Sequence, residues 1–592
     1  MSRRHLALSL ALVVGAALAA FAVALHGSFV NWDDEWLILK NPFLRGLHHL
    51  PEVLDPLADR VLLGAEYLPL RDLSNISDFY FFREEPTGYR LGNWLLHGLT
   101  AGLAFAFLRE ALGSPRAALA GALLWAVHPL HAESVAWASA RKDLLNAVFA
   151  LLAATLWLRA GRTGSRPLGW AAVGAFLLAT LSKTSAAALP AALAAWEAVS
   201  GDPSIPLGRR LLAALRRAAP LLVLAAAGAA FNAAHQDQGW IKAEWRGGGP
   251  LANFFIMSGV HLRYLRQAVL PFGLAPDYAV DEERPDSPGN LLGAAVLVAG
   301  VAGTLWLAGR RPRESLGALW WFGLLVPVAN VFYPLTNASA DRYLFLPLLG
   351  PCALAGLAFE RGLAAGPGAA RAAKAGLAAA AVLLGVAAGA QARVWRDSVS
   401  LWSHGVAISP SCGRAWQNYG EALAMVGRTE EALAAFRRMT EVEPRNSVLW
   451  VHAGNRLWQL GGRQRAKEVE AILRAAVERA GPGMGGPHVA LAWVLNETGR
   501  REEAVALLET AVRLQPGLAE AHFNLGLWHL SERRWVRASE ELEEALRLGL
   551  TLHEEVEAHG RLHDLYGALG DREGARRHRE ERERKKALTW GE

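Results

Sequence analysis

Four short polar segments interrupt a long apolar part of the sequence, and their residue types could support group transfer. The first holds the adjacent carboxylates Asp33 and Asp34. A carboxylate can act as the general base for an acceptor hydroxyl, and a carboxylate pair could also hold a metal ion. The other three segments are His128, His131 and Glu133 followed by Arg141, Lys142 and Asp143; Lys183; and Asp341 with Arg342.

The basic residues of these segments suit the phosphate of a lipid-linked donor. Cations at membrane depth can bind a phosphate and stabilise it as the leaving group. We therefore predict that Asp33 or Asp34 is the base, and that the other residues bind the donor phosphate or shape the site. The phosphate-binding candidates are Arg141, Lys142, Lys183 and Arg342, and the site-shaping candidates are His128, His131, Glu133, Asp143 and Asp341.

Each segment also has an interpretation without catalysis. The acids that begin at Asp33 could cap the first outer helix, and Asp341 with Arg342 could be only an intramembrane ion pair. Lys183 could extend its amine from the apolar layer towards the interface. His128 and His131 could suggest a divalent metal, but Pro129 lies between them and their spacing is not the i, i+4 spacing of a helical zinc pair. The sequence leaves a metal open.

The elements that must position these residues follow from composition, which divides the chain in two. The 592 residues are 52% hydrophobic and 20% charged, with a net charge of +6 and two cysteines. This excludes a disordered chain and a disulfide-rich or cysteine-rich metal module. Residues 1–395 hold 33 Lys/Arg and 26 Asp/Glu, whereas 396–592 hold 28 and 29. The sequence therefore predicts a membrane domain, 1–395, followed by a charged soluble domain, 396–592.

Eleven apolar stretches of the first domain are candidate membrane-spanning helices. The first, 6–25, follows Arg3 and Arg4; it resembles a cleaved signal peptide at 22–24, but its length and the later spans favour an uncleaved anchor. The other ten spans are 91–108, 117–136, 143–158, 167–181, 184–199, 218–233, 290–308, 316–333, 342–359 and 375–392. A further stretch, 251–272, contains charged residues and is not counted among the eleven; we interpret it as an interfacial or re-entrant helix.

The distribution of basic residues predicts the topology. The N-terminus and the loops on its side carry 17 Lys/Arg and 4 Asp/Glu, against 16 and 22 in the rest of the membrane domain. By the positive-inside rule the N-terminus is cytoplasmic. Eleven spans then place the C-terminal domain and all four polar segments on the other side, with a first outer loop at about 26–90. The basic surplus is explained without a nucleic-acid partner.

The second domain shows a repeat of about 34 residues. Small residues recur at Ala432, Ala466, Ala504, Ala538 and Ala575, spaced 34, 38, 34 and 37, and glycines at 461, 499 and 570 mark turns between helices. This pattern is typical of tetratricopeptide repeats, which bind peptides or helices in a concave face. We predict an α-solenoid of four to five repeats, two of them degenerate near 480–487 and 549–555.

Four segments together resemble a known family. They are 29–34 (FVNWDD), 128–145 (HPLHAESVAWASARKDLL), 340–347 (ADRYLFLP) and 395–398 (WRDS). In this order, followed by the repeats, they resemble transmembrane and tetratricopeptide-repeat proteins of the protein O-mannosyltransferase-like GT-C superfamily. The chain differs where bacterial relatives read Ala-Lys-Pro-Met, having Ser182-Lys183-Thr184-Ser185, and where they read Glu-Arg-Lys-Asp, having Ala140 in place of the glutamate.

The resemblance implies an all-α, GT-C-like membrane domain and a catalytic acid in the first outer loop, which maps onto Asp33 or Asp34. It also implies transfer of a sugar, mannose by family expectation, from a polyprenyl-phosphate donor to a hydroxyl of a protein or glycan. The repeats would recruit the acceptor polypeptide. Alternatives are a lipid-linked glycan ligase and an inactive membrane-anchored scaffold for a cell-envelope complex. The Ala, Arg and Gly enrichment suggests a bacterial inner-membrane protein with periplasmic repeats.

Overall fold

The computed structural model describes residues 2–57, 66–235, 243–282 and 284–589, and the regular structure of these residues is helical throughout. No strand occurs among them. The prediction of an all-α fold is confirmed. Part of the expected first outer loop, 58–65, lies outside the described residues. The chain divides into two compact units, Met1–Ser409 and Pro410–Glu592.

The boundary between the units falls after Ser409 and not after Trp395, where the charge density changes. Helix α17 (Ser398–Ile408) belongs to the first unit. The Trp402 indole donates to the Asn31 side chain at 2.9 Å, and the Asn31 amide donates to Ser398 Oγ at 2.9 Å. These long-range bonds attach α17 to the start of the first outer loop, which a composition argument does not detect.

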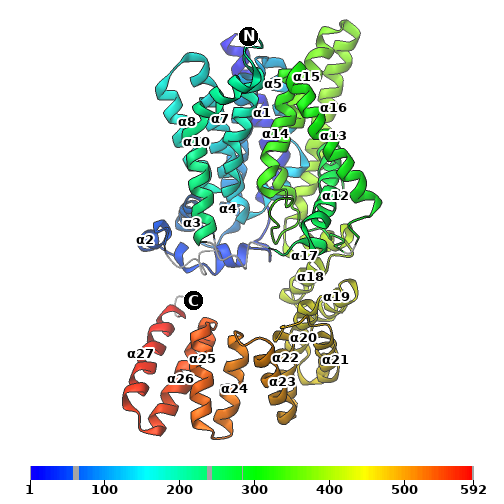
Figure 1. Cartoon of the computed structure of the whole chain (residues 1–592). Helices are drawn as coiled ribbons and strands as arrows, with labels where there is room; N and C mark the ends of the chain where they lie inside the picture. The colour runs from blue at the N-terminus through cyan, green and yellow to red at the C-terminus, as the bar shows by residue number, and fades with distance from the viewer. Residues whose placement is uncertain (1, 58–65, 236–242, 283, 590–592) are drawn as a thin grey trace. The chain divides into compact units, whose positions relative to one another are not determined.

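In the described part of the chain, six helical segments are long and apolar enough to cross a membrane. They run roughly side by side in Figure 1. This supports a multi-pass membrane protein, because a span needs about 20 apolar residues. The helices are α1 (Arg3–Phe21), α4 (Pro86–Leu112), α7 (Arg141–Thr163), α10 (Leu207–His235), α13 (Pro288–Arg310) and α16 (Pro367–Val394).

The other five predicted spans are shorter helices. Proline begins several of them or lies just beyond them, because it fits the first helical turn but interrupts a helix interior. Short 3-10 turns continue the chain at Pro129, Pro327 and Thr184. The helices are α5 (Pro115–Ala126), α8 (Arg166–Ser182), α9 (Leu189–Ser200), α14 (Pro312–Leu325) and α15 (Leu349–Ala364). Two of them stop just before a polar segment, α5 before His128 and α8 before Lys183, and two begin after one, α9 after Lys183 and α15 after Arg342. Stretch 251–272 forms one helix, α12 (Pro250–Val269).

Close helix packing fixes α15 against α5. A Cβ atom added to Gly356 would lie 2.2 Å from the Ala117 carbonyl oxygen, and one added to Gly121 would lie 2.7 Å from the Cys352 carbonyl oxygen. Small residues of this kind allow membrane helices to approach at backbone distance. Since α5 precedes His128 and α15 follows Arg342, this crossing brings two of the polar segments together.

The described residues of the first outer loop form short helices beside these ends. Asp34 and the helix α3 (Pro69–Phe82) lie in this segment, with α2 (Leu50–Leu54) and the short turns η2 (Glu35–Leu39), η3 (Pro42–Leu44) and η4 (Leu47–His49). Helix α3 buries Arg71, Asp72 and Asn75 and exposes Tyr80 and Phe81. We call this side of the first unit the loop-1 end.

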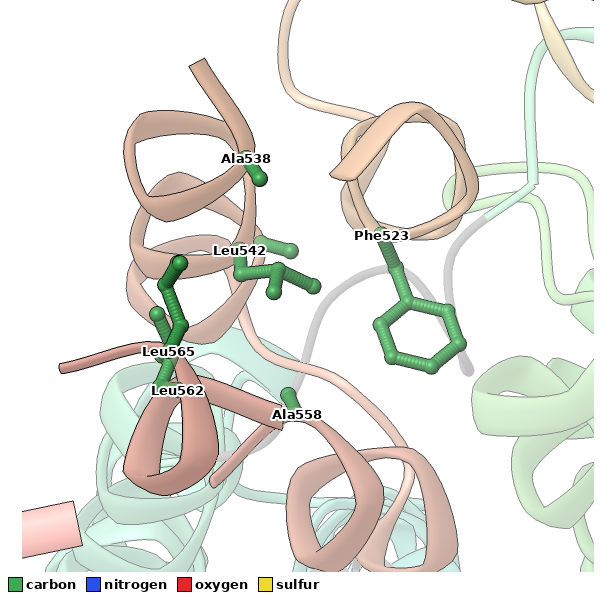
Figure 2. Packing of buried hydrophobic residues seen from close by; sticks show 7 residues of the cluster. Phe523, Ala538, Leu542, Ala558, Leu562 and Leu565 are labelled. Atoms are coloured by element: carbon green, nitrogen blue, oxygen red, sulfur yellow. The ribbon is translucent and has the colours of Figure 1, made fainter. Parts of the chain in front are cut away.

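The second unit is an array of helix pairs (Figure 1). Small residues pack against large ones within and between the pairs, as in the cluster of Phe523, Leu542, Ala558 and Leu562 in Figure 2, which joins the last two pairs. In the second pair the positive φ of the turn falls on Gly462, while Gly461 remains helical. The pairs are α18–α19 (Gly413–Met425, Thr429–Val442), α20–α21 (Ser447–Gly461, Ala466–Glu478), α22–α23 (Gly486–Glu497, Arg501–Leu514), α24–α25 (Ala519–Ser531, Trp535–Leu548) and α26–α27 (Leu552–Leu569, Arg572–Thr589).

Candidate active site

A buried ion pair joins two of the polar segments at the loop-1 end. The Arg342 guanidinium donates to Glu133 Oε1, and the Arg342 backbone amide donates to Glu133 Oε2 at 2.8 Å. Both side chains are buried. The guanidinium also lies 5.3 Å from the Trp137 ring centre and 5.5 Å from that of Tyr343. Glu133 therefore fixes Arg342, which stands on the short turn η10 (Asp341–Leu344).

A narrow pocket of about 30 Å³ opens beside this pair. Its walls include Asp143, Asn146, Lys183, Arg342 and Tyr343. Lys183 Nζ donates to Asp143 Oδ1 and lies 5.7 Å from the Tyr343 ring centre. Within the described residues, Asp143 Oδ2 and Asn146 Oδ1 are buried without a hydrogen-bond partner. Buried polar atoms are normally paired, so these two atoms mark a place where a polar ligand would complete the structure.

Lys142 directly precedes Asp143 on α7, and its amine acts on Glu66, as Lys183 does. Its amine lies 2.6 Å from Glu66 Oε2. Burial by itself would raise the pKa of Glu66, but the charge of Lys142, its hydrogen bond and the charges of Arg71 and Lys183 lower that pKa to about 2. Glu66 is thus an ionised acid within a cluster of cations.

Arg141 differs from its neighbours because protein groups accept hydrogen bonds from four of its five guanidinium N–H donors. It donates to Asn93 Oδ1 at 2.5 Å, to Asp78 Oδ2 at 2.5 Å, to the Tyr89 carbonyl at 2.8 Å and to Ser74 Oγ. The residue is 2% exposed. This arrangement ties α7 to α3 and α4, and it leaves Arg141 without a free face for a phosphate.

The two adjacent carboxylates of the first outer loop have different environments. Asp34 is fully buried and accepts from the Val30 amide at 2.9 Å, from the Ser139 amide at 3.0 Å and from Ser139 Oγ at 2.5 Å. Burial raises its pKa to about 6, although these hydrogen bonds act in the opposite direction. Asp34 therefore joins the outer loop to the segment before α7.

Asp33, in contrast, is partly exposed. Its charge acts on the buried Arg71, which is also paired with Asp72 at 2.7 Å. A general base must reach an acceptor hydroxyl directly. Of the two predicted acids, only Asp33 has an accessible side chain.

The histidines form part of an aromatic cluster. The His131 ring centre lies 4.3 Å from that of Trp125 and 4.5 Å from that of Phe345. The ring centres of His128 and His131 are 6.3 Å apart. Within the described part of the chain, no three His, Cys, Asp or Glu residues are grouped so that they could hold a metal ion. The residues near these histidines therefore do not fit a protein-held metal.

Asp341 belongs to a neighbouring polar network. Tyr278 donates its hydroxyl to Asp341 Oδ1 at 2.7 Å, and Gln267 Nε2 lies 3.4 Å from the same oxygen. Gln267 also donates to the Tyr278 hydroxyl at 2.8 Å. This network supports η10 from the side of α12, one residue before Arg342.

Sequence reasoning missed several residues that complete the site. Glu66 and Tyr278 lie in irregular segments and Ser139 lies in the short 3-10 turn Ala138–Ala140, so none of the three gave a periodic signal. A signal did exist for Asn93 and Asn146, because polar residues inside apolar helices are costly and usually have a role. Asn93 follows Arg90 by one helical turn, and Asn146 follows Asp143 in the same way.

Comparisons with known proteins agree with this architecture. A family model described as "Tetratricopeptide repeat" matches residues 487–517. "Protein O-mannosyl-transferase TMTC3" of Mus musculus is 24% identical over 540 residues, which cover 81% of this chain and 57% of the mouse protein. "Protein O-mannosyl-transferase Tmtc1" of Drosophila melanogaster is 35% identical over 153 residues, 24% of this chain and 18% of the fly protein.

Among solved structures, archaeal oligosaccharyltransferase AglB from Archaeoglobus fulgidus matches 68% of this chain and 56% of its own, with 15% identity and a TM-score of 0.37. The chain spans well under two thirds of these relatives' lengths. The resemblance to transmembrane and tetratricopeptide-repeat proteins is confirmed.

Proposed function

We propose that this protein is an integral-membrane glycosyltransferase of GT-C type. It transfers a sugar from a polyprenyl-phosphate donor to a hydroxyl of a protein or glycan. The sugar is mannose, the one that the relatives' names state. The observation that carries the proposal is the pocket in which Lys183 and Arg342 lie beside the unpartnered atoms of Asp143 and Asn146. A phosphate needs such cations, and a sugar hydroxyl needs such acceptors.

The donor phosphate would bind between Lys183 and Arg342, with Lys142 at the rim. Both cations now pair with acids, Asp143 and Glu133. The phosphate would compete for these contacts and widen the pocket, which is too narrow for a head group as it stands. Arg141 would position α7 and make no contact with the donor, since protein groups occupy its guanidinium.

In the transfer step, Asp33 would take the proton of the acceptor hydroxyl while its oxygen attacks the anomeric carbon. The bond between that carbon and the phosphate oxygen breaks, and the leaving polyprenyl phosphate carries the electron pair. Lys183 and Arg342 would stabilise the negative charge that develops there. Asp34 would hold the outer loop through Ser139.

We further propose that the loop-1 end and the repeats face the periplasm, with the N-terminus in the cytoplasm, in a bacterial inner membrane. The distribution of Lys and Arg supports this topology. A lipid-linked donor and an acceptor outside the cytoplasm would then meet on the same side of the membrane.

The test uses cells that lack the native gene and produce either the full chain or its Asp33→Asn variant. Mass spectrometry of envelope proteins and glycans measures added hexose. We expect hexose with the full chain and with the exposed outer-loop control Glu52→Gln, and none with Asp33→Asn. Equal modification by Asp33→Asn would refute Asp33 as base, and identical spectra with and without the chain would refute the activity.

A catalytically inactive membrane-anchored scaffold is the second candidate. The paired cations and the narrow pocket favour it, because a resting site closed by its own ion pairs needs no ligand. The same spectra decide between the two candidates. If the protein is a scaffold, cells without the chain should have an envelope defect, and the Asp33→Asn variant should correct that defect fully.

A further inference from the structure

The second unit contains a pocket that the repeat pattern alone would not provide. It has a volume of about 500 Å³ and lies along α20 and α22, with the start of α24 at one end. Val448 and Asn455 come from α20, Trp493 from α22 and Glu520 from α24. These are the first helices of three successive pairs, so the pocket follows the face on which tetratricopeptide arrays bind extended segments.

An insertion shapes one wall of this pocket. The spacing between Ala466 and Ala504 is 38 residues instead of 34, and the additional residues lie near the turn before α22. Met484 of this turn lines the pocket and receives a weak hydrogen bond from Ser447 Oγ at 3.8 Å. The Gly485 amide donates to Gln515 Oε1 at 3.1 Å, which fixes the turn to the next repeat. The segment that makes this repeat degenerate is therefore an ordered turn that forms one wall of the pocket.

The pocket wall is apolar and accessible. Val448 is 58% exposed and Trp493 is 41% exposed. The Trp458 ring stacks edge-on against Trp493, with ring centres 5.3 Å apart, and so supports it. Exposed, supported aromatic side chains of this type commonly anchor a partner's apolar side chain. Met484 beside them can adapt to its shape.

Polar groups of the pocket suit a polypeptide backbone and one positive charge. In the described part of the chain, the side-chain amide of Asn455 has no hydrogen-bond partner; this residue is exposed and lines the pocket. Glu520 is the one charged residue among the described residues that line the wall. The charge that acts on it is that of another acid, Glu554, which is engaged in a helix cap with Thr551. Glu520 is exposed, but partial desolvation and then the charge of Glu554 raise its pKa.

We infer that this pocket binds an extended polypeptide segment that carries a bulky apolar side chain followed or preceded closely by Lys or Arg. The apolar side chain would lie against Trp493, Met484 and Val448. Asn455 would bond to the backbone, and Glu520 would pair with the cation. This inference makes specific the expectation that the repeats recruit a polypeptide, and it does not depend on sugar transfer.

The test measures peptide binding by the full chain in detergent, without donor. The probes are fluorescein-labelled Gly/Ser peptides with one Phe and one Arg separated by one to four residues, and fluorescence anisotropy gives their affinities. We expect at least one spacing to bind at least tenfold more tightly than the same peptide without Phe. Replacing Arg by Glu should abolish the preference for that spacing.

Variants of the chain identify the site. Trp493→Ala should lower the affinity for the best peptide at least tenfold, and Glu520→Gln should lower it about threefold to fivefold, as expected for an accessible ion pair. The matched controls are Trp535→Ala and Glu532→Gln, which lie outside the pocket. Binding of no Phe/Arg peptide, or equal effects of pocket and control variants, would overturn the inference. If the full chain binds the peptide but adds no hexose in cells, only the proposed enzyme activity is refuted.

Discussion

At the scale of single residues, neighbouring side chains of the same type have different functions because their burial differs. Asp33 and Asp34 are adjacent, but Asp34 is enclosed by three hydrogen bonds and Asp33 is accessible. Arg141 and Lys142 are also adjacent, but Arg141 donates four hydrogen bonds to protein groups, whereas Lys142 pairs with Glu66. Substitutions at these pairs should therefore separate chemistry from stability.

Asp33→Asn should lower transfer at least a hundredfold and leave the melting temperature unchanged, because a general base contributes about 10²–10⁴ in rate. Asp34→Asn should leave transfer per folded molecule unchanged and shift the melting temperature instead. The substitution removes the ionisation penalty of the buried carboxylate, but the amide cannot accept from Val30 and Ser139 at once, which costs about 1–3 kcal/mol. Thermal unfolding in detergent and hexose incorporation measure the two effects. Loss of transfer in Asp34→Asn, with normal transfer in Asp33→Asn, would show that Asp34 is the base.

The raised pKa of Asp34 also predicts a pH dependence. Its ordinary value is 3.8 and its folded value is about 6, so the ionised group destabilises the folded chain above pH 6, by ~3 kcal/mol. This penalty falls as the pH decreases through about 6 and disappears near 3.8. Between pH 7.5 and 5, the native chain should gain more thermal stability than Asp34→Asn. Equal pH profiles would contradict the assignment.

The donor pocket gives a third prediction at this scale. Asn146→Leu removes an unpaired buried carbonyl, so the melting temperature should stay equal or rise. Donor affinity should nevertheless fall about tenfold, because an acceptor facing the sugar is lost. Native mass spectrometry with polyprenyl-phosphate mannose measures binding. The control is Thr155→Val on the same helix, whose hydroxyl bonds to its own helix at Leu151; it should bind donor normally.

At the scale of elements, the site depends on helices that end early. Helices α5 and α8 are shorter than a membrane span and stop just before His128 and Lys183, and the short helix α9 begins just after Lys183. A non-helical backbone at membrane depth is stable only where protein groups enclose it. The crossing of α5 and α15 provides this enclosure and places Glu133 within reach of Arg342.

Glycine substitutions test that crossing. Gly356→Ala should lower stability by about 1–3 kcal/mol, because its Cβ would meet the Ala117 carbonyl. Gly174→Ala on α8 has no neighbouring atom within 4 Å and should be neutral or slightly stabilising, since alanine favours a helix. Thermal unfolding of the two variants is the measurement. Equal destabilisation would show that the crossing is not close-packed.

At the scale of the whole molecule, the two units differ in the polarity of their surfaces. Six described helices are apolar enough for a membrane, whereas the helix pairs after Pro410 carry many surface ion pairs, such as Arg437 with Glu468. Single-cysteine labelling tests their proposed placement, because native Cys352 and Cys412 are buried. An impermeant maleimide should label Ser531→Cys but not Arg371→Cys once the outer membrane is permeabilised. The reverse pattern would invert the topology.

The sequence by itself determined the helical class and the tetratricopeptide array, because both depend on local patterns of apolar and small residues. It also located the polar segments, since charges are rare and costly between apolar stretches. It did not distinguish six long helices from five short ones, because hydropathy does not report where a helix breaks against its neighbours.

Only the tertiary structure decided which of these polar residues are accessible. The enclosure of Asp34 by Ser139, the pairing of Lys142 with Glu66 and the hydrogen bonding of Arg141 all involve residues from separate segments. Burial and hydrogen bonding are properties of the packed chain, and two adjacent aspartates are equivalent until packing covers one of them. The sequence determined the residues available for chemistry, and packing decided which of them a substrate could reach.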